Sequence, residues 1–289
     1  MLGVPPDVQS VRLAGGRRLA YREFGDLSGA PMLYFHGGLS SGLDGAFAHG
    51  AARDRGVRIV APDRPGVGES FRLMPREVRD WADDVAALCD HLGLARFSVL
   101  GWSAGGPFAL ACALRLGDRI VRTATVGGMA PIRDKLTVRQ LGLAVDRALF
   151  PLSRRAPLLA QLAISNGSLG SDAALQRRLV RGLPSRSDKS VVTAMTPEEA
   201  VGPWRAAVRH GARGLVDDYA VTGSDWGFAL HEVTAPVTVF QGAEDTIVPM
   251  AHAEVLAARL GDARLEVVEG AGHFAFHVAT DRVLDELTR

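Results

Sequence analysis

The chain has 289 residues, with 33 Lys and Arg against 32 Asp and Glu, so its formal net charge is +1. This length suits one large domain, or a domain with an insertion, and can bury a substantial core. The balanced charge argues against the basic surface of a nucleic-acid-binding protein and against polybasic segments that bind anionic membranes. We therefore expect neither nucleic acid nor membrane as a partner.

The N-terminal segment Met1 to Ser10 contains no Lys or Arg and no long apolar stretch, so it does not resemble a secretory signal. The longest apolar runs, such as Phe108 to Leu114, are shorter than the roughly 20 residues that span a bilayer. We expect a cytoplasmic protein. Cys89 and Cys112 lie in helix-like segments and are expected to be reduced core thiols, with a disulfide between them as the alternative.

Short β-rich runs alternate with helix-like segments along much of the chain. Val11 to Leu13 and Leu19 to Phe24 flank Gly15 and Gly16, which predicts a hairpin. The later runs are compact, β-branched and apolar, as expected for strands buried on both faces of a parallel sheet. These runs are Met32 to Phe35, Val57 to Ala61, Phe97 to Leu100, Val121 to Val126, Val237 to Phe240 and Leu265 to Val268.

Helical periodicity lies between these runs, at Trp81 to Leu92, Ala104 to Leu116 and Ala251 to Leu260. The alternation predicts an α/β fold, with a mostly parallel central sheet and helices on both faces. From Pro131 to Phe228, however, we find helix-like segments and no convincing strand. The candidate helices there are Leu136 to Phe150, Pro157 to Ile164, Asp172 to Leu183 and Glu198 to His210.

We therefore predict two domains. A core domain comprises residues 1–130 and 229–289, and a helical cap (lid) domain comprises residues 131–228, inserted after the sixth strand of the main sheet.

The strongest chemical signal is the G-x-S-x-G pattern at Gly101-Trp102-Ser103-Ala104-Gly105. It follows an apolar strand and opens an apolar helix, which is the context of a nucleophilic serine on a sharp strand–helix turn. Small residues are needed on both sides of such a serine because strand and helix approach each other closely. Ser103 is therefore the candidate nucleophile.

A serine hydroxyl needs a base that removes its proton, and the base needs an acid that orients it. His273 lies in a Gly-rich loop just after the last predicted strand, and His277 is its main rival. Asp245 follows the strand Val237 to Phe240, at the sheet edge where parallel sheets bind ligands. Glu244 is the neighbouring alternative. We predict the triad Ser103, His273 and Asp245.

Negative charge that develops on a substrate oxygen needs backbone N–H donors. Ala104, directly after Ser103, supplies one predicted donor. The second is expected from the loop after the first parallel strand, at Gly38, with Leu39 as the alternative. We interpret His36, in the same loop, as a hydrogen-bonded brace.

These motifs resemble the α/β-hydrolase superfamily, in particular its capped, esterase-like serine hydrolases. They occur in the family's order, with the triad order serine, acid, histidine, and the resemblance covers nearly the whole chain outside the cap. In the family, the Asp63 segment is a structural turn near the site, so it carries no catalytic role here. The matching segments are His36-Gly37-Gly38, Asp63 to Ser70, Gly101 to Gly106, Gly242 to Asp245 and Gly272-His273-Phe274.

The resemblance implies a serine hydrolase, most simply a carboxylesterase acting on small, largely apolar esters, and implies no cofactor and no metal. Epoxide hydrolases and haloalkane dehalogenases carry Asp where this chain has Ser103, which argues against their chemistry. A proline iminopeptidase-like peptidase remains an alternative, although Leu39 and Ser40 depart from that pattern and only Glu198 and Glu199 suggest an amine site. The interpretations as a carbon–carbon bond hydrolase and as a non-catalytic hydrolase-like receptor also stay open.

The predicted partner is a small-molecule substrate, and the chain is expected to be a monomer or a homodimer. Apolar side chains near the predicted triad or in the predicted cap are expected to line the acyl pocket. They are Leu39, Trp102, Met129, Trp204, Trp226, Ile247 and Phe274.

Overall fold

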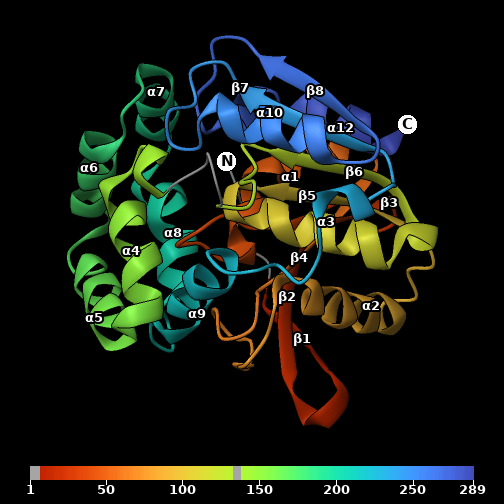
Figure 1. Ribbon diagram of the computed structural model, residues 1–289, viewed down its shortest axis with the longest axis horizontal. Helices are drawn as coiled ribbons and strands as arrows, with labels where there is room; N and C mark the ends of the chain where they lie inside the picture. Colours follow the sequence, from red (N-terminus) through yellow and green to blue (C-terminus); the bar gives the residue numbers. More distant parts are fainter. Residues whose placement is uncertain (1–6, 133–137) are drawn as a thin grey trace.

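An eight-stranded sheet forms the centre of the computed structural model, which describes residues 7–132 and 138–289 (Figure 1). The order of the strands across the sheet is β1-β2-β4-β3-β5-β6-β7-β8. The strands are β1 (Gln9–Arg12), β2 (Arg18–Gly25), β3 (Ala30–Phe35), β4 (Val57–Pro62), β5 (Phe97–Trp102), β6 (Ile120–Val126), β7 (Val237–Gly242) and β8 (Ala263–Val268).

The sheet is mostly parallel. β1 and β2 form the predicted antiparallel hairpin, with Val11 opposite Leu19, and β2 also runs antiparallel to β4. From β4 through β3, β5, β6 and β7 to β8, each neighbouring pair is parallel. The predicted strands and fold class are confirmed. Because the last six strands in this order are parallel, the loops that follow them meet at one edge of the sheet.

Helices cover both faces of the sheet. One face carries α2 (Trp81–His91), α3 (Gly106–Arg115) and α10 (Met250–Arg259), which bury Trp81 and Phe108 in a shared apolar cluster. These three helices confirm the predicted periodic segments. Pro107 lies in the first turn of α3, where a missing backbone N–H leaves no hydrogen bond unmade.

The other face carries α1 (His49–Asp54), α11 (Ala275–Val278) and α12 (Thr280–Thr288). Leu284 of α12 and Tyr34 of β3 are buried in the cluster on this side. We did not delimit these helices from the sequence. α1 has six residues and α11 has four, too few for helical periodicity to stand out from neighbouring loops. Short 3-10 helices lie at η1 (Ala14–Gly16), η2 (Gly42–Ala48), η3 (Val78–Asp80), η4 (Ser103–Gly105), η5 (Gly117–Arg119), η6 (Val138–Gln140) and η7 (Leu230–Glu232).

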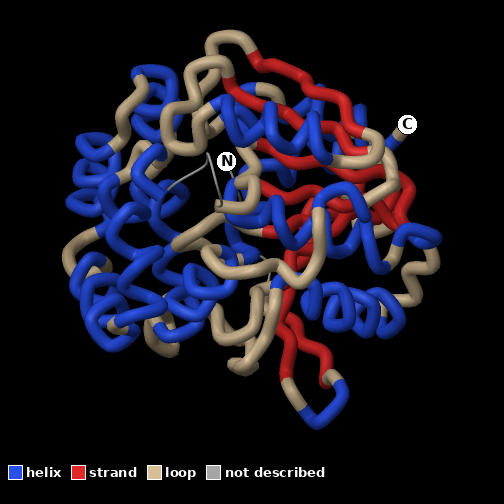
Figure 2. Tube along the Cα trace, viewed as in Figure 1, coloured by secondary structure: helices blue, strands red, loops and turns tan. Residues whose placement is uncertain are grey.

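Between β6 and β7, residues 127–132 and 138–236 contain helices and no strand. Figures 1 and 2 show these helices gathered on one side of the molecule, beside the sheet, and they share an apolar cluster that includes Leu149, Ile164 and Leu215. The helices are α4 (Ala144–Arg155), α5 (Pro157–Gly167), α6 (Asp172–Gly182), α7 (Arg186–Ala194), α8 (Pro197–Ala207) and α9 (Arg213–Thr222).

The sequence predicted four helices in this region, and the structure adds α7 and α9. α7 begins with a polar run, Arg186-Ser187-Asp188-Lys189-Ser190, which hides its helical character. The predicted helix Leu136 to Phe150 starts at residues outside the described part of the chain, and α4 begins only at Ala144. A separate cap domain at residues 131–228 stays a prediction.

Cys89 and Cys112 are buried and free, as expected for reduced core thiols. Burial raises the pKa of Cys89 to about 12, which keeps this thiol protonated near neutral pH. Within the described residues, no helix is both long and apolar enough to cross a membrane. The expectation about Met1 to Ser10 falls mostly on residues 1–6, which lie outside the described residues.

Candidate active site

Four loops meet where the parallel strands end. His36 follows β3, Ser103 follows β5, Asp245 lies just beyond β7, and His273 lies beyond β8. These strands are neighbours or near neighbours in the sheet, so residues far apart in the sequence reach one edge. The parallel topology thereby gathers the predicted site residues.

Ser103 sits on a strained turn between β5 and α3. Its φ angle is +54°, in the left-handed region that non-glycine residues rarely adopt. A Cβ atom on Gly101 would lie 2.5 Å from the Gly105 carbonyl oxygen, and one on Gly105 would overlap the Phe35 carbonyl oxygen. Only glycine allows this approach of strand and helix, so the G-x-S-x-G spacing has a direct steric cause.

Asp245 and His273 form a buried hydrogen-bonded pair. His273 Nδ1 lies 2.8 Å from Asp245 Oδ2, and the same oxygen accepts from Gln241 Nε2 at 3.1 Å. The other oxygen, Oδ1, accepts the backbone N–H groups of Ile247 and Val248, each at 2.9 Å. Four donors around one carboxylate fix its orientation, and the imidazole that it holds keeps Nε2 free to accept a proton.

The charge around His273 favours its protonated form. Burial alone would lower the pKa of His273, but the Asp245 carboxylate, with smaller effects from Asp188 and Asp146, raises it above the ordinary value. The imidazolium that forms during proton transfer would therefore be stabilised where it lies.

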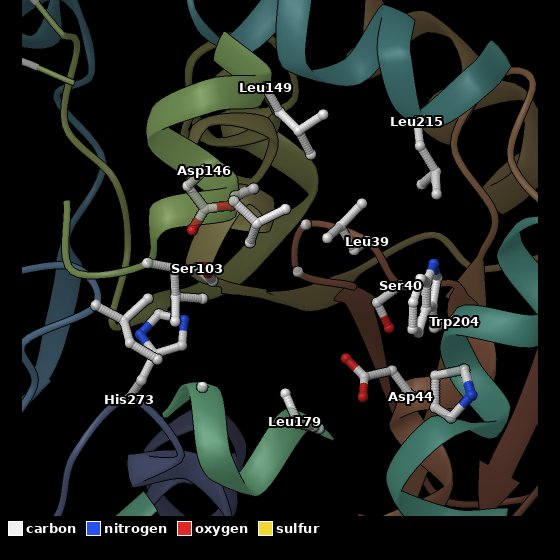
Figure 3. A pocket seen from close by; sticks show the side chains of 18 of the residues that line it. Leu39, Ser40, Asp44, Ser103, Asp146, Leu149, Leu179, Trp204, Leu215 and His273 are labelled. Carbon is white, nitrogen blue, oxygen red and sulfur yellow. The ribbon is translucent and has the colours of Figure 1, made fainter. Parts of the chain in front are cut away.

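The serine turn and the histidine loop are physically joined. Trp102, the residue before Ser103, donates its indole N–H to the His273 carbonyl oxygen at 3.0 Å. Ser103 and His273 line the same cavity, and Figure 3 shows both side chains on one side of it. The structure thus gathers the three predicted triad residues at one place.

His277 and Glu244, the alternatives to His273 and Asp245, do not form such a hydrogen-bonded pair. The His277 ring stacks on Phe47 with 3.7 Å between ring centres, and burial lowers the pKa of His277 to about 3. No carboxylate among the described residues bonds to His277. Glu244 is exposed to solvent, whereas the neighbouring Asp245 is buried against His273.

Gly38 and Ala104, the two residues predicted to supply the oxyanion donors, lie close together. A Cβ on Gly38 would lie 3.8 Å from Ala104 Cβ and 3.3 Å from the Tyr219 hydroxyl oxygen. Leu39, the alternative donor, has a φ of +51°. Among the described non-glycine residues, only Leu39 and Ser103 have positive φ, and both line the cavity. Strain of this kind is typical of functional loops.

Arg64 braces the loop that carries Gly38. It is fully buried, and its guanidinium donates to the carbonyl oxygens of His36 at 2.6 Å and Gly37 at 3.0 Å. Asp218 of α9 accepts from Arg64 Nε at 2.7 Å and also pairs with Arg76. Burial, together with Arg64, lowers the pKa of His36 well below its ordinary value. A neutral, hydrogen-bonded His36 agrees with its interpretation as a brace.

Asp188, in α7, holds the histidine loop from the side of the inserted helices. Its buried carboxylate accepts the Phe274 backbone N–H at 3.0 Å, one residue after His273. A Cβ on Gly272 would collide with this carboxylate, so the glycine before His273 is required for the contact. Sequence reasoning missed this role, because nothing in α7 suggests a partner in the last loop.

A cavity of about 520 Å³ extends from Ser103 and His273 beneath α4, α6, α8 and α9. Six of the seven predicted lining residues border it: Leu39, Trp102, Met129, Trp204, Ile247 and Phe274. Trp226 does not. It is 2% exposed, belongs to the core cluster around α2 and α3, and donates its indole N–H to the Thr222 carbonyl oxygen. An aromatic residue near the insertion boundary can face either cluster, and composition does not distinguish them.

Besides Asp218, the aspartates Asp44 and Asp146 line this cavity, and all three were missed in the sequence. Tyr34 donates to Asp44 Oδ2 at 3.0 Å, and Tyr219 donates to Asp146 Oδ1 at 2.5 Å. Burial raises the pKa of Asp44 to about 6 and also raises the pKa of Asp146. Glu199 also lines the cavity, and its carboxylate accepts from the backbone N–H and the hydroxyl of Thr196 at the start of its own helix. Within residues 7–132 and 138–289, no group of three His, Cys, Asp or Glu side chains is arranged to hold a metal ion.

Comparison with known proteins identifies the family of this chain. The family model described as alpha/beta hydrolase fold matches residues 30–280. An uncharacterized protein of Mycobacterium bovis is 27% identical over 300 residues, which cover 99% of this chain and 81% of that protein. The 2-hydroxymuconate semialdehyde hydrolase of Pseudomonas putida is 25% identical over 272 residues, which cover 93% of this chain and 89% of that protein.

A solved thermophilic esterase from Thermogutta terrifontis superposes with a TM-score of 0.69 over 96% of each chain, at 21% identity, a likeness that concerns the fold alone. The relatives support a hydrolase in general terms. With the matched segment running from β3 into α12, the chain belongs to the alpha/beta hydrolase fold family.

Proposed function

We propose that this protein is a serine hydrolase that cleaves ester-like bonds of small, largely apolar substrates through Ser103, His273 and Asp245. The observation that carries the proposal is the buried hydrogen bond between His273 and Asp245, made on the wall of the cavity into which the strained Ser103 turn opens. A hydroxyl, an imidazole and an oriented carboxylate at one sheet edge are the groups that acyl transfer requires.

In the proposed mechanism, His273 Nε2 removes the proton of Ser103 as its oxygen attacks the substrate carbonyl carbon. The N–H groups of Gly38 and Ala104 stabilise the resulting oxyanion. The carbon–oxygen bond to the alcohol then breaks, and His273 gives the proton to the departing oxygen. Water repeats the sequence on the acyl-enzyme, which releases the acid and restores Ser103.

The chemistry of the cavity supports the proposed substrate class. Apolar side chains from α4, α5, α6 and α9, namely Leu149, Ile164, Leu179 and Leu215, line the walls. A volume of about 520 Å³ suits a small molecule and not a polymer. We propose that residues 131–228 act as a cap that encloses the acyl chain of the substrate.

The first experiment is labelling with a fluorophosphonate probe, followed by peptide mapping. The expected result is one modified serine, Ser103, and no labelling of Ser103→Ala protein. A panel of 4-nitrophenyl esters, amino-acid anilides and ring-fission dienones then separates ester hydrolysis from peptide-bond and carbon–carbon bond cleavage. The Pseudomonas putida relative, named as a semialdehyde hydrolase, makes the dienone arm a necessary comparison.

Preferred turnover of anilides or dienones would overturn the ester assignment while leaving the triad in place. A folded protein whose Ser103 resists the probe would overturn the hydrolase proposal itself. That outcome would favour a receptor-like role, because simple ligand binding does not need an activated serine.

A further inference from the structure

The cavity has two chemically different ends. Ser103 and His273 lie on one side of it in Figure 3, whereas Asp44, Ser40 and Trp204 lie together on the other. The apolar side chains of Leu39 and Leu179 lie between the two sides in this view. A ligand that fills the cavity therefore meets the proposed nucleophile at one end and a carboxyl group at the other.

Asp44 lies in the first turn of η2 and has no cationic partner among the described residues. Its Oδ2 accepts from the Tyr34 hydroxyl at 3.0 Å, and it forms no ion pair with a described residue. Arg64 is the cation that lowers the pKa of Asp44, but Arg64 is already bound to Asp218 and to two backbone carbonyls. A carboxylate in an apolar cavity without a counter-ion is costly unless a ligand supplies the positive charge.

Ser40 provides a second polar group at the same end. Its residue is 7% exposed, and its hydroxyl is close enough to Asp44 to favour the ionised carboxylate. The contact nevertheless falls short of a hydrogen bond, and the Ser40 hydroxyl has no hydrogen-bond partner among the described residues. A buried hydroxyl without a partner beside a carboxylate without a counter-ion indicates a place for a donor group of a ligand.

The other charged groups on the wall are already engaged. Asp146 accepts from Tyr219 and lies near His273, whose pKa it helps to raise. Arg178 is exposed and donates to the Gly167 carbonyl oxygen. The wall carries the carboxyl groups of Asp44, Asp146, Glu199 and Asp218 against the guanidinium groups of Arg64 and Arg178. The charge balance of the cavity therefore favours a cation there.

We propose that the enzyme prefers substrates whose apolar acyl chain ends in a protonated amine, with the ammonium group bound by Asp44 and Ser40. This inference rests on the proposed ester hydrolysis at Ser103. The ammonium donates one N–H to the Asp44 carboxylate and another to the Ser40 hydroxyl oxygen. The apolar chain spans the middle of the cavity, and the scissile carbonyl reaches Ser103. A charge-assisted hydrogen bond in such surroundings is stronger than a contact with a neutral group. We therefore expect the enzyme to prefer the cationic over the neutral substrate by about 10- to 100-fold.

The test compares two esters of nearly equal shape, 4-nitrophenyl 6-aminohexanoate and 4-nitrophenyl heptanoate, which differ by an ammonium in place of a methyl group. Shorter and longer ω-amino esters, each paired with its methyl analogue, locate the best length. The readout is the ratio of kcat/KM for the cationic ester to that for the neutral ester. We expect a ratio of about 10 or more in the unmodified protein.

Asp44→Asn keeps the shape of the side chain and removes its charge, so the ratio should fall to near one. Asp54→Asn removes the same charge from an exposed position of α1 and should leave the ratio unaltered. A ratio near one at every chain length in the unmodified protein overturns the proposal, and so does a ratio that survives Asp44→Asn. Ser40→Ala, expected to lower the ratio a few-fold, serves if Asp44→Asn does not fold.

A binding measurement separates this inference from the proposed reaction. Calorimetry on Ser103→Ala protein should detect hexylamine more tightly bound than hexan-1-ol, and Asp44→Asn in that background should remove the difference. If amine binding depends on Asp44 but no ester is hydrolysed, the cation site stands and the hydrolase proposal is wrong. If the neutral ester is hydrolysed but hexylamine binds no more tightly than hexan-1-ol, the hydrolase proposal stands and the cation site is wrong.

Discussion

The carboxyl edge of the sheet presents its functional groups on turns with enforced backbone geometry, whereas the α4–α9 helices present theirs from ordinary helical positions. Ser103 has a positive φ, and His273 sits behind a glycine that admits no side chain. Asp146, Asp188 and Tyr219 occupy regular helices and reach the same cavity or loop only through packing. We infer that the turns carry the proposed chemistry and that the helices adjust the charge and shape of the cavity.

If that division is correct, the largest effect should come from the nucleophile at the sheet edge. Ser103→Ala should reduce ester turnover by a factor on the order of 10⁴ to 10⁶, because no other group can form the acyl-enzyme. The thermal unfolding midpoint should change little. Ser190→Ala, an exposed serine of α7, is the matched control and should retain full turnover. Turnover close to that of the unmodified protein in Ser103→Ala would contradict the mechanism.

The next effect should come from the acid of the same edge. Asp245→Asn preserves shape but removes the charge that holds the His273 tautomer, so kcat should fall by about 10³- to 10⁴-fold. The exposed neighbour provides the control, since Glu244→Gln should leave kcat unchanged. A larger loss in Glu244→Gln than in Asp245→Asn would reverse the assignment of the acid. Steady-state kinetics on a neutral ester give the measurement.

The pH dependence of activity should show whether Asp245 or burial dominates the pKa of His273. In the proposed mechanism His273 acts as a base only when it is neutral. Burial lowers its pKa, but Asp245 outweighs this effect and raises the pKa above 6.5. Activity should therefore be full above this raised pKa. It should fall about tenfold for each pH unit below it. The acidic limb of kcat/KM on a neutral ester gives the apparent pKa, and a value below 6.5 would contradict the electrostatic account.

The smallest effect should come from the helices. Asp188→Asn removes a charge that helps to raise the pKa of His273 but keeps an acceptor for the Phe274 N–H. The acidic limb of the kcat/KM profile should therefore move to lower pH, and kcat/KM should fall a few-fold. Asp188→Ala also removes the acceptor and should cost about tenfold in kcat/KM, since the buried N–H loses its partner.

The control for these two variants is Asp172→Asn, which removes a charge from α6 that is paired with Arg205 away from the histidine loop. This variant should change neither the acidic limb of the pH profile nor kcat/KM. If Asp188→Ala matched Asp245→Asn in severity, the distinction between an edge that performs the chemistry and helices that adjust it would fail.

The sequence supported the prediction of the sheet and of the edge residues because each is encoded locally. Strands such as Phe97 to Leu100 are apolar on both faces, and Gly101 and Gly105 flank Ser103 for a steric reason that any such turn shares. The prediction failed for Trp226, which packs in the core, and it did not foresee Asp44 in the cavity. An aromatic or acidic residue carries no local mark of the surface that it will face.

The amino-acid sequence by itself determined the strand–helix alternation, the order of the motifs and the backbone that glycine permits at the serine and histidine turns. Only the tertiary structure decided that α7 would hold the His273 loop through Asp188. It also decided that Asp44, which has no ion pair with a described residue, would lie across the cavity from Ser103. Backbone strain and periodicity arise from residues a few positions apart. Contacts between α7 and the last loop join residues 86 positions apart, and they exist only once the whole core has packed.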